Sequence, residues 1–97
     1  MKMKERDIEK AVTDHAKKKG WLSFKWTSPA QRFVPDRLYF KDSKVIMIEF
    51  KRPGGKPTKG QRLMHQILER AGFSVHVVDG TGAGKSTAVR ELAYHIL

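Results

Sequence analysis

The sequence predicts a mixed α/β domain in which helices flank a small mixed sheet. Apolar side chains recur at helical spacing in residues 5–19 and 58–71, whereas four other segments are rich in strand-forming residues. These strand candidates are residues 21–27, 36–40, 44–51 and 73–78. With a last helix the predicted order is α-β-β-β-α-β-α. A chain of 97 residues holds one modest core, so residues 1–97 are expected to form a single domain.

The first helix is predicted over residues 5–19. Ile8, Val12 and Ala16 lie on one face, acidic residues come early and three lysines come late, as the helix dipole favours. Gly20 follows as a suitable C-terminal cap. The next segment reads as a strand up to a Ser-Pro pair, which breaks it.

The following two strand candidates are separated by a short polar turn and predict a β-hairpin. Whether the loop has two residues or four, its centre lies between Asp42 and Ser43. Facing residues therefore have numbers that sum to 85. This register places Asp36 opposite Glu49.

The second half of the chain begins with a Pro/Gly linker at residues 53–57. The helix at residues 58–71 then ends before Gly72, a strand follows, and a Gly-rich turn leads into the last helix. The second helix is expected to present one apolar stripe, formed by Leu63, Met64, Ile67 and Leu68.

The composition is strongly basic, with 20 Lys and Arg against 10 Asp and Glu and a formal net charge of +10. In so small a domain this charge predicts a polyanionic partner, foremost a nucleic acid, although charge that serves only solubility is an alternative. The absence of cysteine excludes disulfides and thiolate–zinc sites. With no signal peptide and no apolar run of about twenty residues, a soluble cytoplasmic protein without membrane contact is expected.

Asp36, Glu49 and Lys51 form the candidate catalytic site. In the predicted register the Cβ atoms of Asp36 and Glu49 are about 5 Å apart, and Lys51 lies on the same face as Glu49. Two facing carboxylates repel each other unless a cation lies between them, and a divalent ion with oxygen ligands meets this need. Such an ion beside an ammonium group suits phosphodiester hydrolysis. The alternative is structural: Lys51 only neutralises the two carboxylates.

The string Val34-Pro35-Asp36 followed by Ile48-Glu49-Phe50-Lys51 resembles the signature of the PD-(D/E)xK nucleases. A wider set of positions resembles the virus-type replication-repair nuclease (VRR-NUC) domain of that superfamily. These positions are Glu9, Pro53, Gly54, Pro57, Gln61, His65, Gly72, Val77 and Asp79. The likeness covers residues 8–79, but residues 30–33 carry side chains where family members often have glycines, which affects how closely DNA approaches.

The resemblance implies a restriction-endonuclease-like fold and a DNA endonuclease that uses Mg²⁺ or Mn²⁺. The metal ligands it implies are Asp36, Glu49, the carbonyl of Phe50 and Glu9. It makes Lys51 the catalytic base or water-orienting group, with Glu9 and Gln61 as secondary catalytic residues. Stand-alone viral and bacterial members resemble junction-resolving dimers. A homodimer acting on branched DNA such as a four-way (Holliday) junction, in a phage or its bacterial host, is therefore expected.

The secondary residues also have structural interpretations. Glu9 lies at the edge of the apolar stripe of its helix, where the helix dipole alone would favour a solvated acid. Gln61 fits a capping box with Thr58. His65 lies one turn after Gln61, but a lone helical histidine is more often a packing residue, so it is left out of the catalytic set.

Basic residues gather around the Pro/Gly linker, next to the expected carboxylate pair. This loop is the expected track for the DNA backbone. The loop before Pro35 would add Arg32, while the neighbouring Phe33 either stacks on DNA or packs in the core. The expected DNA-binding residues are Arg32, Arg52, Lys56, Lys59 and Arg62.

The glycine-rich turn at residues 80–87 resembles a phosphate-binding loop, because it follows a strand and opens a helix. The motif, however, needs a glycine where this chain has Asp79, and only 11 residues follow Ser86, which leaves no later strand for a Mg²⁺-binding Asp. No nucleotide cofactor is therefore expected. A non-catalytic DNA-binding module is the other alternative, which would leave Asp36 and Glu49 unexplained.

The last helix is the expected dimer surface, because it offers more apolar area than a terminal helix on a small sheet needs. Its apolar residues are Val89, Leu92, Ala93, Tyr94, Ile96 and Leu97.

Overall fold

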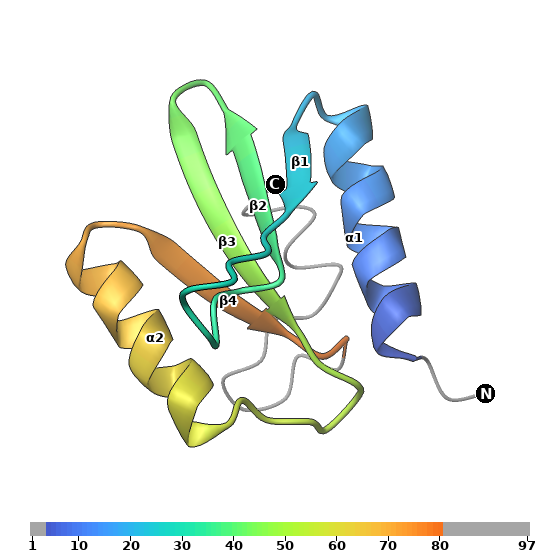
Figure 1. The fold of residues 1–97 in the computed structure, drawn as a ribbon. Helices are drawn as coiled ribbons and strands as arrows, with labels where there is room; N and C mark the ends of the chain where they lie inside the picture. Colours follow the sequence, from blue (N-terminus) through green and yellow to red (C-terminus); the bar gives the residue numbers. More distant parts are fainter. Residues whose placement is uncertain (1–3, 81–97) are drawn as a thin grey trace.

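The computed structural model describes residues 4–80, which form two helices and a four-stranded sheet (Figure 1). The elements are α1 (Glu5–Lys18), β1 (Leu22–Lys25), β2 (Arg37–Lys41), β3 (Lys44–Phe50), α2 (Lys59–Arg70) and β4 (Ser74–Val78). The strand order is β1-β2-β3-β4; β1, β2 and β3 are antiparallel, and β4 is parallel to β3. The predicted mixed sheet is confirmed. The predicted last helix lies outside the described residues.

The β2–β3 hairpin has the predicted register. Lys41 pairs with Lys44 and Arg37 pairs with Ile48, so facing numbers sum to 85 and the loop has two residues. These residues, Asp42 and Ser43, have φ angles of 50° and 64°. Positive φ at both loop positions matches the twist of the flanking strands in a two-residue hairpin.

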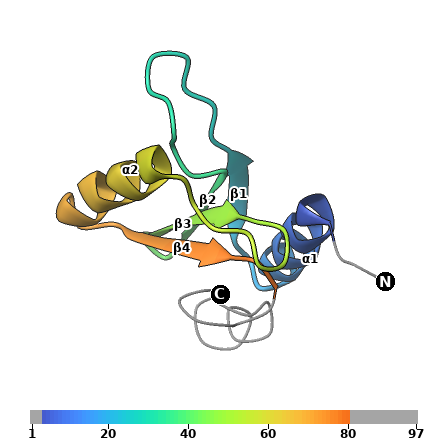
Figure 2. The same ribbon diagram turned by 90° about the horizontal axis from the view of Figure 1, so that it is seen from below.

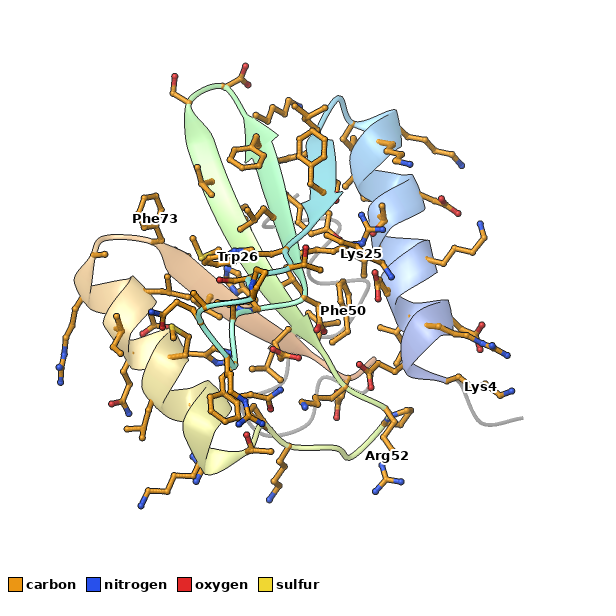
Figure 3. All side chains as sticks on the ribbon, in the orientation of Figure 1. Lys4, Lys25, Trp26, Phe50, Arg52 and Phe73 are labelled. Carbon is orange, nitrogen blue, oxygen red and sulfur yellow. The ribbon has the colours of Figure 1, made fainter. Side chains whose placement is uncertain are left out.

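The main core lies between α1 and one face of the sheet. Because side chains alternate along a strand, Ile46, Ile48 and Phe50 of β3 face α1, where they meet its buried Ile8 and Val12. Figure 3 shows Phe50 between β3 and α1. The intervening Met47 and Glu49 therefore point to the opposite face, on the side of α2 (Figure 2). Within the part of the chain described, no helix is long and apolar enough to cross a membrane.

The apolar stripe expected on α2 is only partly directed inward, which corrects that prediction. Leu63 and Ile67 are 49% and 57% exposed, whereas His65, at 8%, is the buried residue of this helix. Half-buried Met64 and Leu68 complete the inward face. The reason is that α2 lies beside β4, at one edge of the sheet, so only one side of the helix faces the sheet (Figure 1).

The loop between β1 and β2 extends away from the sheet toward the start of α2 (Figure 2). It carries Phe33, which has a φ of 68° although it is not a glycine. A Cβ atom on Gly60, in the first turn of α2, would lie 2.8 Å from the Phe33 ring. The aromatic ring therefore rests directly on the helix backbone, and glycine at position 60 permits this contact.

Gly60→Ala and Phe33→Gly are expected to couple in stability. Alanine improves helix propensity by about 1 kcal/mol over glycine, but at position 60 its methyl group must displace the Phe33 ring. The full gain should therefore be measured only when Phe33 is already glycine. Denaturant unfolding of both single variants and the double variant gives the coupling, expected at about 0.5–1 kcal/mol. Additive effects would contradict this contact.

Candidate active site

Asp36 and Glu49 face each other at one end of the β2–β3 hairpin. Asp36 directly precedes β2 and Glu49 is the penultimate residue of β3, so the observed register makes them neighbours. The backbone N–H of Phe50 donates to Oδ2 of Asp36 at 2.8 Å. This bond fixes the Asp36 carboxylate against β3.

The electrostatic environment of Asp36 favours its protonated form. Burial is the main cause that raises its pKa, to about 7 from an ordinary value of 3.8, while the bond from the Phe50 N–H opposes this. The negative charge of Glu49, a side-chain hydrogen bond with it and the charge of Glu5 raise the pKa further. Within residues 4–80 no Lys or Arg pairs with either carboxylate, and a cation between the two would relieve the repulsion.

Glu49 is only 2% exposed, and its Oε1 atom is buried without a hydrogen-bond partner among the described residues. Nε2 of His65 lies 3.8 Å from this oxygen and is likewise buried without a partner. Sequence reasoning set His65 aside. The burial of His65 against Glu49 depends on how α2 crosses the sheet, so no local pattern could have revealed it.

Lys51 follows β3 and is half-buried. Its backbone N–H donates to the carbonyl of Val78 at 2.9 Å, which continues the pairing between β3 and β4. Within residues 4–80 its ammonium group forms no ion pair with Asp36 or Glu49. The structural alternative is a lysine that only neutralises both acids. The described contacts do not include the close ion pairs that this alternative would need.

Glu9 forms an ion pair with Arg37, whose Nε lies 2.6 Å from Oε2 of the glutamate. Arg37 also donates to Oγ of Ser23 at 3.0 Å. Glu9 is therefore neither a solvated acid nor an uncommitted metal ligand. The helix acid that acts electrostatically on Asp36 is Glu5, one turn earlier on α1. Because Glu5 precedes Glu9 by four residues, about one helical turn, the sequence already indicated that both acids lie on the same side of the helix.

Gln61 adopts the structural alternative, since the capping box is formed. Its Oε1 accepts the N–H of Thr58 at 2.9 Å, and its own N–H donates to the Thr58 hydroxyl at 3.2 Å. The two bonds fix the start of α2. Among residues 4–80 the side-chain amide nitrogen of Gln61 has no hydrogen-bond partner.

The loop after Lys51 is held to the end of β4. The N–H of Gly54 donates to Oδ2 of Asp79 at 3.0 Å, and Asp79 is 2% exposed. Its buried carboxylate thus shapes the linker loop. Residues 81–87 of the phosphate-loop-like motif lie outside the described residues.

The basic residues expected to bind DNA surround the linker and the start of α2. Arg52, Lys56 and Lys59 are exposed, and Figure 3 shows Arg52 at the outer edge of the molecule. Nη1 of Arg62 donates to the Pro57 carbonyl at 2.9 Å. The Arg32 guanidinium stacks on the Phe33 ring, 5.4 Å from its centroid. Because Phe33 rests on Gly60, Arg32 belongs to the same surface.

The residues at this site fit a hard divalent cation better than a transition-metal cluster. No group of three His, Cys, Asp or Glu side chains in residues 4–80 is arranged to hold a metal. Mg²⁺, however, commonly uses one or two carboxylates and takes its other oxygens from water and substrate phosphate. The facing carboxylates of Asp36 and Glu49, with the nearby Phe50 carbonyl, match that donor chemistry.

Comparison with known proteins places these features in a family. The sequence matches no family model. It is 40% identical over 78 residues to "Putative nuclease p44" of Acyrthosiphon pisum secondary endosymbiont phage 1, which covers 79% of this chain and 84% of that protein. A solved structure of a "VRR_NUC domain" superposes with a TM-score of 0.78 at 20% identity, over 96% of this chain and 97% of the other.

The phage relative shows that the chain belongs to a family of nucleases, the family of "Putative nuclease p44". Its fold is that of a VRR-NUC domain, the family that its sequence motifs resemble.

Proposed function

We propose that this protein is a Mg²⁺- or Mn²⁺-dependent endodeoxyribonuclease, with its active site at Asp36, Glu49 and Lys51. One observation carries the proposal: the carboxylates of half-buried Asp36 and buried Glu49 face each other, no Lys or Arg within residues 4–80 pairs with either, and the pKa of Asp36 is raised to about 7. Perturbed titratable groups of this kind concentrate at functional sites. A structural ion pair would instead have brought a basic side chain between them.

In this proposal Asp36, Glu49 and the Phe50 carbonyl hold the metal. When bound, the ion polarises the scissile phosphate and acidifies a water molecule. Asp36 is oriented for this role by the Phe50 N–H. The Lys51 ammonium group orients the attacking water or stabilises the charge that develops on the phosphate. Glu9 and Gln61 remain proposed secondary residues, Glu9 acting from its ion pair with Arg37.

The proposed substrate is DNA bound through its phosphates on the basic surface around the linker. Arg32, Arg52, Lys56, Lys59 and Arg62 would supply these contacts, which give affinity but no sequence information. The net charge of +10 supports a polyanionic substrate. A single domain spanning residues 1–97 would place this surface and the carboxylates on one small body.

A cleavage screen tests the function directly. Four-way, flapped, nicked and linear DNA would each be incubated with Mg²⁺, with Mn²⁺ and with a chelator. Cutting in either metal and none with the chelator is expected, with branched DNA preferred. Metal-independent cutting, or binding without any cutting, would reject the proposal. ATP should have no effect on any of these rates.

We also propose that the protein acts as a homodimer on four-way junctions. One active site cuts one strand per encounter, whereas a two-fold dimer places two sites against a pseudo-symmetric junction. Light scattering at micromolar concentration should give twice the mass of one chain, 11.1 kDa, and junctions should receive paired nicks. A monomer that cuts linear duplex and junctions equally would contradict both parts.

A further inference from the structure

The contact between β3 and α2 contains two buried polar atoms that face each other without hydrogen bonds. Oε1 of Glu49 and Nε2 of His65 are 3.8 Å apart, and their side chains are 3% and 10% exposed. A buried polar group without a partner is unfavourable, because it has lost its hydrogen bonds to water and gained none in the protein. A pair that served only packing would be better replaced by apolar side chains, so this arrangement points to a role at the site.

We propose that His65 is a positioning residue for Glu49. Its Nε2–H group holds Oε1 of Glu49, so that the other carboxylate oxygen stays directed toward Asp36. The present gap exceeds an ordinary N–H···O hydrogen bond by under about 1 Å, which a side-chain rotation closes. This inference rests on the proposed function of the Asp36–Glu49 pair.

The surroundings of His65 suit a fixed donor. Met64 and Leu68 are half-buried on the same helix, and the Thr58–Gln61 capping box fixes the start of the helix. Within residues 4–80 no group donates a hydrogen bond to Oε1 of Glu49, so this oxygen is available to His65. Carboxylates that bind metals are commonly oriented by such outer hydrogen bonds, and their loss lowers metal affinity by about 10–100-fold.

Mn²⁺ binding to the full chain without DNA tests the proposal, by calorimetry or by the spin resonance of free Mn²⁺. His65→Leu should weaken binding by about 10–100-fold. His65→Gln, whose amide nitrogen takes the place of Nε2, should stay within a few-fold of the wild type, whereas His65→Asn should behave as His65→Leu does. His76→Leu, the same change at a half-buried histidine on β4, should leave the affinity unchanged.

Cleavage kinetics provide a second readout. His65→Leu should lower kcat while KM for DNA stays constant, and raised Mn²⁺ should restore much of the rate. A Mn²⁺ affinity of His65→Leu within twofold of the wild type would overturn the proposal. If His65→Leu does not fold, equal affinities of the folded Gln and Asn variants would overturn it.

Glu49→Gln, measured in parallel, separates this inference from the proposed function. If Glu49→Gln binds Mn²⁺ as tightly as the wild type, the proposed metal site itself is wrong. If Glu49→Gln loses binding and His65→Leu keeps it, only the positioning role is wrong.

Discussion

Asp36→Asn, Glu49→Gln and Lys51→Ala are each expected to reduce DNA cleavage by about 10²–10⁴-fold or more. The first two remove charge that would hold the proposed metal, and the third removes the ammonium group proposed to act on the water or the phosphate. DNA affinity should change by only a few-fold, because phosphate contacts elsewhere dominate binding. Cleavage under single-turnover conditions and gel-shift binding in EDTA measure the two effects separately.

Two matched controls accompany these variants. Asp14→Asn changes an exposed aspartate that pairs with Lys10 on α1, and Lys44→Ala changes an exposed lysine at the far end of β3. Both should keep wild-type cleavage. Wild-type rates in all three active-site variants would remove the catalytic assignment from this hairpin.

The stability of the metal-free protein is expected to fall as the pH rises from about 4 to 8. Because the pKa of Asp36 is raised to about 7 in the folded protein, its contribution to stability is complete below the unfolded value of 3.8. That contribution is lost as the pH passes through the folded value. Asp36→Asn removes the titration and retains an acceptor for the Phe50 N–H.

The melting temperature of Asp36→Asn should therefore exceed that of the wild type by several degrees at pH 8 and not at pH 4. In a domain of this size about 1 kcal/mol corresponds to about 4–8 °C. Mg²⁺ or Mn²⁺ should raise the wild-type melting temperature at pH 8 and leave that of Asp36→Asn unchanged. Without metal, the same dependence of melting temperature on pH in both proteins would contradict the raised pKa of Asp36.

The hairpin and its register could be predicted because both depend on neighbouring residues. The centre of the loop lies between Asp42 and Ser43, and that local fact alone sets Asp36 against Glu49. The capping box of Thr58 and Gln61 could be predicted for the same reason. The VRR-NUC resemblance then supplied the family.

The orientation of α2 could not be predicted from its apolar pattern. Leu63 and Ile67 suggest an inward face, but the face that packs is decided by where the helix crosses the sheet, which depends on distant strands. The burial of His65 against Glu49 follows from that crossing. The pairing of Glu9 with Arg37 similarly joins residues 28 positions apart, a contact that only the packed α1 creates.

The contact between Phe33 and Gly60 also has an evolutionary consequence. A glycine at position 60 is required only while a ring occupies position 33, and the left-handed backbone at 33 would itself suit glycine. Substitutions at these positions should therefore be contingent on each other: lineages that acquire glycine at 33 become free to replace Gly60. The two positions are therefore expected to change together during evolution, although 27 positions separate them in the chain.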